Sequence, residues 1–166
     1  FPGRRANEYR RSARAIQGSA TLMADGGILQ RDAERTVADA LLQALRADTD
    51  VQAVFGAPAR IHESETQEPT YPYAILERHE TRPAGSAGVS GTEHILTLGI
   101  ASRFGGRRYA REFMGAIRAA VERAELAIAG QRAVLSYTSY GDVFRARDRR
   151  TLRGLLRIRI ITEEII

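Results

Sequence analysis

Two stretches of the chain repeat apolar residues at the spacing of an amphipathic helix. Over residues 28–47 these positions include Leu41 and Leu45, which fall on one face at 3.6 residues per turn. Residues 107–124 show the same pattern. The sequence therefore predicts two amphipathic helices, the second with a buried stripe made of Tyr109, Phe113, Ala116, Ile117, Ala120, Val121 and Ala124.

Five other stretches have the composition or the alternation of strands. An apolar residue at every second position is typical of a strand with one buried face. In the last stretch Leu152, Leu156, Ile158 and Ile160 take one face, and the other face holds Arg153, Leu155, Arg157, Arg159 and Ile161. The predicted strands cover residues 59–62, 71–82, 93–103, 133–140 and 151–162.

The order of these elements indicates the fold class. One helix, three strands, one helix and two strands, without regular β-α-β alternation, are typical of an α+β fold. We expect a mostly antiparallel sheet covered on one face by the two amphipathic helices. The other face carries Thr97, Gly99, Arg157 and Arg159, so it is half polar and faces water or a partner.

The net charge of +5 is concentrated in the N-terminal segment. Residues 1–22 hold five arginines against Glu8, a net of +4, whereas the other residues have a net of +1. The basic composition of the whole chain therefore does not establish a nucleic-acid-binding domain. We expect one domain over residues 23–166, preceded by a basic, flexible segment over residues 1–22.

Three interpretations of residues 1–22 stay open. The native protein starts at Met23 and the segment is upstream sequence, or the segment is an arginine- and serine-rich transit peptide. In the third interpretation it is a basic arm that binds phosphate or an acidic neighbour.

Residues suited to catalysis or metal binding are few. Cysteine is absent, which excludes disulfides, thiol nucleophiles and cysteine-based zinc sites. His62, His79 and His94 do not have the helical spacing of a metal site. We interpret them as surface or rim residues, with a cross-strand site between His79 and His94 left open. No Gly-x-Ser-x-Gly sequence indicates a hydrolase nucleophile, and no run of 18 apolar residues could span a membrane. We therefore expect neither enzymatic activity nor a cofactor, metal ion or membrane partner.

A glycine-rich loop joins the second and third predicted strands. Residues 83–91 read Pro-Ala-Gly-Ser-Ala-Gly-Val-Ser-Gly. A phosphate-binding loop would lead into a helix N-terminus, whereas this stretch lies between two strands. We therefore expect a long, mobile loop closing an antiparallel hairpin.

A pair of arginines follows the turn that precedes the second helix. Arg107 and Arg108 come directly after Gly105 and Gly106, so backbone N–H groups and two guanidinium groups could meet an anion. The alternative is a solvated first helical turn. That interpretation is favoured because arginine opposes the positive end of the helix dipole.

The arginines of the last strand form the second basic group. Arg153, Arg157 and Arg159 project from one strand face, where they could bind a partner's carboxylates or track phosphates. The alternative is neutralisation within the chain by acids on the neighbouring strand, such as Glu77 or Glu93.

Six short segments in the order of the chain resemble one protein family. They are ALLQALRAD (40–48), YPYAIL (71–76), EHILTL (93–98), Ser102-Arg103 with Gly105, LAIAG (126–130) and LRGLLRIR (152–159). This ordered set resembles the small tail-completion proteins of long-tailed phages and of bacterial gene transfer agents, which are called tail terminators. The resemblance covers about residues 30–163.

The resemblance implies an α+β subunit of a hexameric ring that has no catalytic residues. Such a ring caps the head-proximal end of the tail tube in a virion or gene transfer agent particle assembled in the bacterial cytoplasm. Its partners would be the tail tube protein, the head–tail connector or stopper protein, and the DNA that passes through the ring.

Several residues are candidates for contacts within such a particle. For assembly or the DNA channel they are Arg107, Arg108, Arg153, Arg157 and Arg159, and for the inter-subunit loop Gly85, Ser86, Gly88, Ser90 and Gly91. Two other functions stay open, a head-closure or stopper subunit and a nucleic-acid-binding module that uses the arginine-rich strand.

Removal of residues 1–22 should leave the fold intact, because this segment has no apolar face to bury. We expect a chain that starts at Met23 to keep the thermal midpoint of the full chain in circular dichroism. Loss of soluble protein, or a midpoint lower by more than a few degrees, would contradict a separate segment.

Overall fold

The structure is a computed structural model that describes residues 33–103 and 105–165 of the 166-residue chain. The described residues from Thr36 onward form one compact unit. The expectations for residues 1–22 and for a domain start at Met23 lie outside the described residues.

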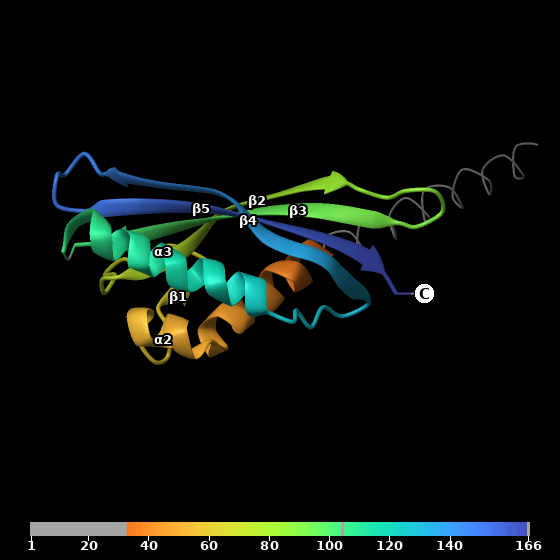
Figure 1. Ribbon diagram of the computed structural model, residues 1–166, viewed down its shortest axis with the longest axis horizontal. Coiled ribbons are helices and arrows are strands. Elements are labelled where there is room, and N and C mark those ends of the chain that lie inside the picture. Colours follow the sequence, from red (N-terminus) through yellow and green to blue (C-terminus); the bar gives the residue numbers. More distant parts are fainter. Residues whose placement is uncertain (1–32, 104, 166) are drawn as a thin grey trace, which may run out of the picture. The chain divides into compact units, whose positions relative to one another are not determined.

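Five strands form a single sheet in the order β1-β2-β3-β5-β4 (Figure 1). Only β1 and β2 pair in parallel, so the mostly antiparallel sheet and the α+β class are confirmed. The fourth strand is longer than predicted because register shifts beside Val134 and Ser139 interrupt its alternation. The strands are β1 (Ile61–His62), β2 (Tyr73–Pro83), β3 (Gly91–Ser102), β4 (Gln131–Arg145) and β5 (Leu152–Glu164).

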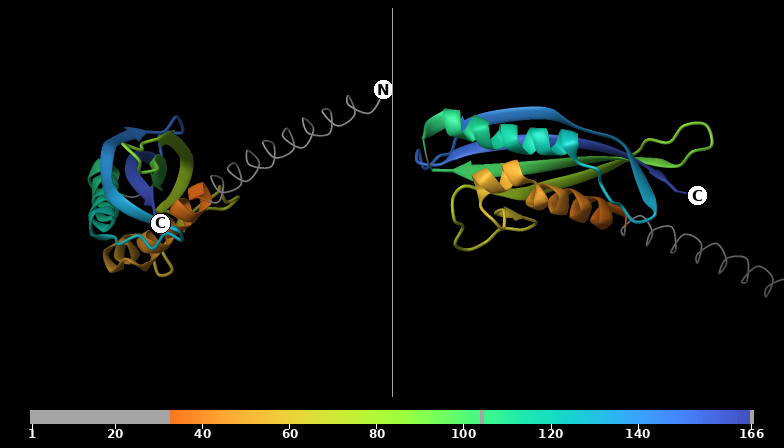
Figure 2. Two further views of the ribbon diagram at one scale, coloured as in Figure 1. Left: turned by 90° about the vertical axis from the view of Figure 1, so that its right-hand side faces the viewer. Right: turned by 60° about the horizontal axis from the view of Figure 1, so that its bottom comes forward.

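The helices lie on one side of this sheet (Figure 2). Residues 33–47 are helical, α2 spans Thr49–Phe55 and α3 spans Gly106–Arg123. Asp48 caps α2 by accepting hydrogen bonds from the backbone N–H groups of Asp50 and Val51. The two predicted helices are confirmed where the structure describes them, while residues 28–32 of the first lie outside the described residues. The short α2 is a third helix on the same side.

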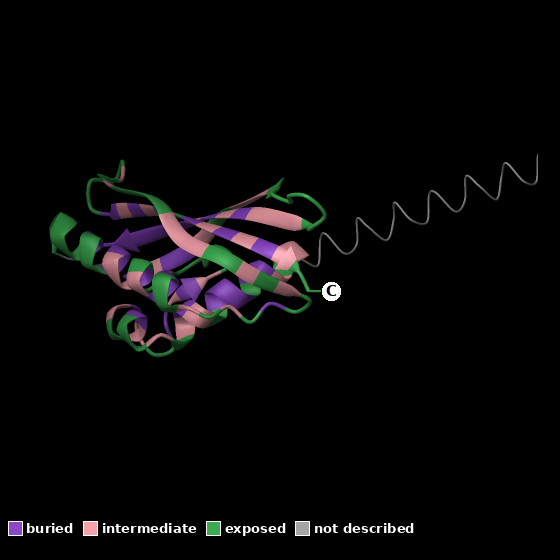
Figure 3. Ribbon diagram, turned by 45° about the vertical axis from the view of Figure 1, so that its right-hand side comes forward, coloured by how far each residue is buried: buried purple, intermediate pink, exposed green. Residues whose placement is uncertain are grey.

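The core lies between the helices and the sheet, where buried residues concentrate (Figure 3). Phe55 of α2 contacts Phe113 of α3 with 5.7 Å between ring centroids. Leu98, Leu156 and Ile158 of the two central strands are buried beneath these helices. Burial of each large apolar side chain contributes about 1.5–3 kcal/mol, so this layer supplies most of the stability.

The buried stripe of α3 differs from the prediction at its start. Tyr109 is 46% exposed, while Ala110 and Met114 are buried. The reason is local geometry, because Gly141 and Gly154 leave room for Met114 against the sheet. The ring of Tyr109 instead folds back over Gly105.

The glycine-rich loop is shorter and more regular than predicted. β2 and β3 stay paired as far as Pro83 and Thr92, and Ala84 N–H donates to the Gly91 carbonyl at 3.0 Å. Val89 N–H donates to the Ser86 carbonyl at 2.8 Å, with Gly88 at a φ of +91° between them. The antiparallel hairpin is confirmed, and its glycines and serines form a tight turn instead of a long loop.

Two glycine substitutions should test the contact between α3 and the sheet. We expect Gly154→Val to lower the free energy of unfolding by about 1–3 kcal/mol, because a side chain there meets the Met114 sulfur. Gly115→Ala, in a part of α3 with open space around it, should raise the free energy of unfolding by about 0.5–1 kcal/mol. Urea denaturation measures both changes, and equal effects would contradict the packing described here.

Candidate assembly surfaces

The face of the sheet opposite the helices contains the three arginines of β5. Along β5, the residues at even positions from Leu152 to Thr162 are buried, and those between them point away from the helices. Arg153, Arg157 and Arg159 therefore share one face, as predicted. We call this side of β2, β3, β4 and β5 the open face.

Arg153 is neutralised within the subunit. It forms an ion pair with Glu77 of β2, whose side chain crosses β3 directly above Gly99. A Cβ at position 99 would clash with this carboxylate. A register shift beside Glu77 interrupts the pairing of β2 with β3. The pair therefore depends on an irregularity in β2 and on a glycine in β3.

Arg159 is held on two sides. Its Nε donates to the carboxylate of Glu93, and its Nη1 donates to the hydroxyl of Tyr137 at 2.8 Å. Together these hydrogen bonds raise the pKa of Arg159 further above its usual value, with the Tyr137 bond as the larger cause. The suggestion that Glu77 and Glu93 neutralise the strand is therefore correct for two of its three arginines.

Arg157 has a different environment. It lies between Thr97 and Tyr140 in the register of the sheet, with its Cζ 5.3 Å from the centre of the Tyr140 ring. Among the described residues no carboxylate forms an ion pair with it. This guanidinium is the one of the three that can pair with a group outside the subunit.

Large apolar side chains lie beside these arginines on β4. Leu135, Tyr140 and Phe144 point to the open face in register with β5 and are 45%, 46% and 39% exposed. Exposed aromatic residues interleaved with arginine are typical of protein–protein interfaces. The open face therefore has the composition of a protein-binding surface.

The other two arginine candidates are not on this face. Arg107 and Arg108 are exposed in the first turn of α3, on the helix side of the sheet. Arg108 pairs with Glu112 at 3.5 Å, one turn along the helix. The structure therefore separates the arginine candidates into two surfaces.

The interpretation of the histidines as surface or rim residues is wrong for His94. This residue is 0% exposed, because its position in β3 points to the helix side of the sheet. Its Nδ1 lies 3.0 Å from Nε2 of His79, and its Nε2 lies 3.3 Å from the Thr162 hydroxyl. The cross-strand histidine pair therefore exists. Within the described residues no group of three potential ligands could hold a metal ion.

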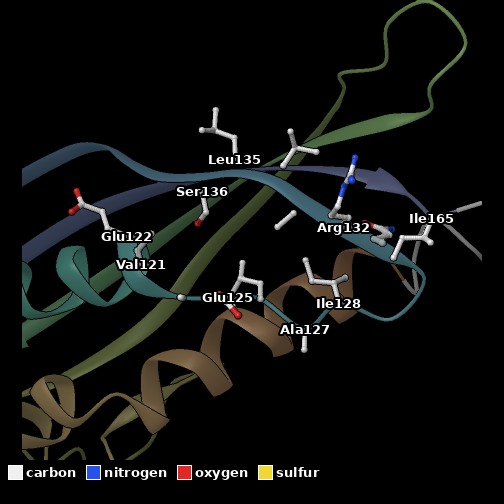
Figure 4. A pocket seen from close by; sticks show the side chains of 14 residues that line it. Val121, Glu122, Glu125, Ala127, Ile128, Arg132, Leu135, Ser136 and Ile165 are labelled. Atoms are coloured by element: carbon white, nitrogen blue, oxygen red, sulfur yellow. The ribbon is translucent and has the colours of Figure 1, made fainter.

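A groove lies between β4 and the segment that follows α3 (Figure 4). Its volume is about 510 Å³, and its lining includes Glu125, Ile128 and Ile165. Ser136 points from β4 toward segment 124–128, while Leu135 points the other way (Figure 4). The buried oxygens of Ser136 Oγ and Gln131 Oε1 have no hydrogen-bond partner among the described residues.

A second, charged cleft lies further along the same edge of the sheet. Arg111 and Arg118 of α3, together with residues 141–143 of β4, line a volume of about 390 Å³. This cleft is not among the sites predicted from the sequence. The spacing of Arg111 and Arg118 was the available signal, since residues seven apart share a helix face. The sequence alone did not show which strand would lie beside them.

No described helix has both the length and the apolar character needed to cross a membrane.

The sequence profile of a family described as tail completion protein gp17 matches residues 39–163. No curated protein sequence matches the chain. One solved structure with the same fold is a chain in the virion of a native gene transfer agent particle. It has a TM-score of 0.66 and 21% sequence identity, over 74% of this chain and 91% of that chain.

The basic turn between β4 and β5 should give the fold a measurable acid sensitivity. Asp148 accepts hydrogen bonds from the Thr151 hydroxyl and from the N–H groups of Thr151 and Arg150, which lower the pKa of Asp148 to about 2. Its stabilising effect is present above the pKa of the unfolded chain, about 3.9, and is lost as the pH falls toward 2. We expect Asp148→Asn to reduce the loss of thermal midpoint between pH 5 and pH 2, each relative to its own value at pH 7. An unchanged pH profile would contradict this role of Asp148.

Proposed function

We propose that this chain, which belongs to the tail completion protein gp17 family and is a structural protein of the virion tail, forms a ring that terminates the tail tube. In this proposal six copies close the ring, one face of the ring meets the tube, and the other meets the head–tail connector. DNA passes through the centre of the ring. The chain has no catalytic role in this function.

The composition of the open face is the observation that supports this proposal most. Its aromatic and aliphatic residues on β4 adjoin the arginines of β5, and two of these arginines are already neutralised by Glu77 and Glu93. Burial of such a surface costs less free energy than burial of unpaired arginines would, because two of its charges are paired before the partner arrives. It is suited to a protein neighbour in the tail.

The same pairing makes the open face a poor surface for DNA. Binding to phosphates gains free energy from cations that displace condensed counterions. On β5 only Arg157 is available for this, since Arg153 and Arg159 already hold carboxylates. A ring through which DNA must slide also gains nothing from tight phosphate contacts.

We further propose that the turn of the β2–β3 hairpin contacts a neighbouring subunit. The hairpin reaches beyond α2 and α3 at its end of the sheet (Figure 1). Its tip consists of small residues, Gly85, Ser86, Gly88, Ser90 and Gly91, around the exposed Val89. A small, uncharged tip can approach another subunit closely without burying a charge.

Electron microscopy of the full chain with assembled tail tubes tests this function. We expect the wild-type chain to form rings and to cap one end of each tube, so that added tube protein no longer extends that end. Arg157→Glu should reduce capping, because it reverses the one open-face guanidinium on β5 that lacks an internal carboxylate. The thermal midpoint should stay unchanged, since Arg157 is exposed.

Arg147→Glu, in the exposed turn between β4 and β5, is the matched control and should cap tubes normally. The absence of wild-type rings and caps would overturn the proposed function. Binding of the full chain to duplex DNA at physiological salt that is lost in Arg157→Glu would favour the nucleic-acid-binding module instead.

A further inference from the structure

We infer that adjacent copies of this chain bind each other through two oppositely charged edges of the sheet. The acidic loop, residues 63–68 beside β1, would enter the basic cleft of the next copy, which Arg111 and Arg118 of α3 form with β4, and would approach Arg107 on the same side of α3. This inference rests on the proposed ring and identifies the surfaces that close it.

The acidic loop directly follows β1, the strand at one edge of the sheet. Glu63, Glu65 and Glu68 are all exposed, and none of them forms an ion pair with a described residue. Residues 63–68 contain no basic residue. Three uncompensated carboxylates therefore lie on this edge.

The basic cleft occupies the opposite edge. Residues Arg107, Arg111 and Arg118 are four and seven positions apart, so they form a stripe along one side of α3. The guanidinium of Arg118 lies against Gly141 of β4, the strand at this edge. Asp142 is the one acid in the lining of the cleft, and it forms no ion pair with a described arginine. The stripe therefore keeps a net positive charge.

The position of this stripe is unfavourable for α3 itself. Arg107 and Arg111 lie in the first two turns, at the positive end of the helix dipole, and the first turn has no acidic residue. Gly105 provides no side-chain cap. The arginines thus do not stabilise the helix that carries them, whereas a carboxylate from another molecule would be favoured at this end.

Strand register places the two edges at the same level of the sheet. His62 of β1 pairs with Ile75, Ile75 with Gly99, Gly99 with Leu155, and Leu155 with Asp142 of β4. One row of residues therefore runs from the start of the acidic loop to the basic cleft. Copies placed side by side, with their strands in the same direction, bring loop and cleft together without an axial shift.

Contact between two different surfaces of the same chain generates a closed ring or an open filament. An interface without axial shift is the condition for closure, because rotation about a ring axis leaves every atom at the same height. Direct strand addition at β4 is less suited to this contact, since register shifts beside Val134 and Ser139 interrupt the edge. The side chains of the loop and the cleft are therefore the better source of specificity.

Reversal of the charges on each edge provides the test. The cleft variant is Arg111→Glu with Arg118→Glu, and the loop variant is Glu65→Arg with Glu68→Arg. All four residues are exposed, so each full-length variant should keep the wild-type thermal midpoint. Arg147→Glu with Arg150→Glu, in the exposed β4–β5 turn, is the control with the same change of charge as the cleft variant.

Each variant alone should require at least about tenfold more protein than the wild type to form rings, because like charges then meet at every interface. An equimolar mixture of the two variants should assemble again, with the variants alternating around the ring. The chain with all four substitutions should also form rings. Sedimentation and electron microscopy measure ring formation, and the control pair should behave as wild type.

Wild-type rings together with normal rings from either variant alone would overturn the edge contact and leave the proposed ring standing. Failure of both the equimolar mixture and the fourfold variant to form rings would also overturn the edge contact. Restored opposite charges would then not restore assembly, so the losses in the single-edge variants would have another cause than attraction between the edges. Absence of wild-type rings, even beside tube ends, would overturn the proposed function and this inference together.

Discussion

Burial of one face of β5 beneath the helices determines which surfaces the molecule presents. Leu156, Ile158 and Ile160 are fully buried, and the alternation of the strand then forces the arginines between them to the other side. A slip of one residue would bring Arg157 and Arg159 into the core, where an uncompensated charge costs several kcal/mol or more. Burial of alternate residues of β5 therefore fixes the register of the central strands and, at the same time, places the arginines on the open face.

The same burial brings several arginines together on one face, and residues of the neighbouring strands compensate their charge. Arginines on a broad, half-apolar face would repel one another, and their charges would keep water bound to that face. Glu77 and Glu93 remove most of that cost, and Glu77 reaches Arg153 only because β2 is irregular there and Gly99 has no side chain. Tyr137 and Tyr140 extend the arrangement onto β4, where each ring lies beside a guanidinium. The open face therefore presents arginine and aromatic side chains to a partner without a large unpaired charge.

Much of this fold could be predicted from local pattern, and the failures have identifiable causes. The alternation of β5 and β3 and the stripe of α3 reflect one-sided burial, so each appears in the sequence as a regular spacing of apolar residues. The exposure of Tyr109 and the burial of Met114 depend on glycines in β4 and β5, which are remote in the chain. The buried pair of His79 and His94 depends on cross-strand register, and the cleft at Arg111 and Arg118 depends on which strand lies beside α3. Contacts between distant elements therefore set the limit of the sequence analysis.

Charge is distributed differently over the open face and over the two edges. On the open face, ion pairs within the subunit satisfy most arginines, so a contact there would depend on the area and shape of its aromatic and aliphatic residues. At the edges the charges have no internal partners among the described residues, so a contact there would depend on Coulomb attraction and would be weakened by salt. Screening beyond about 8 Å at physiological ionic strength also limits such attraction to copies already side by side. A subunit built this way can stay dispersed when dilute and still select one neighbour at each edge, because the wrong edge presents the same sign of charge.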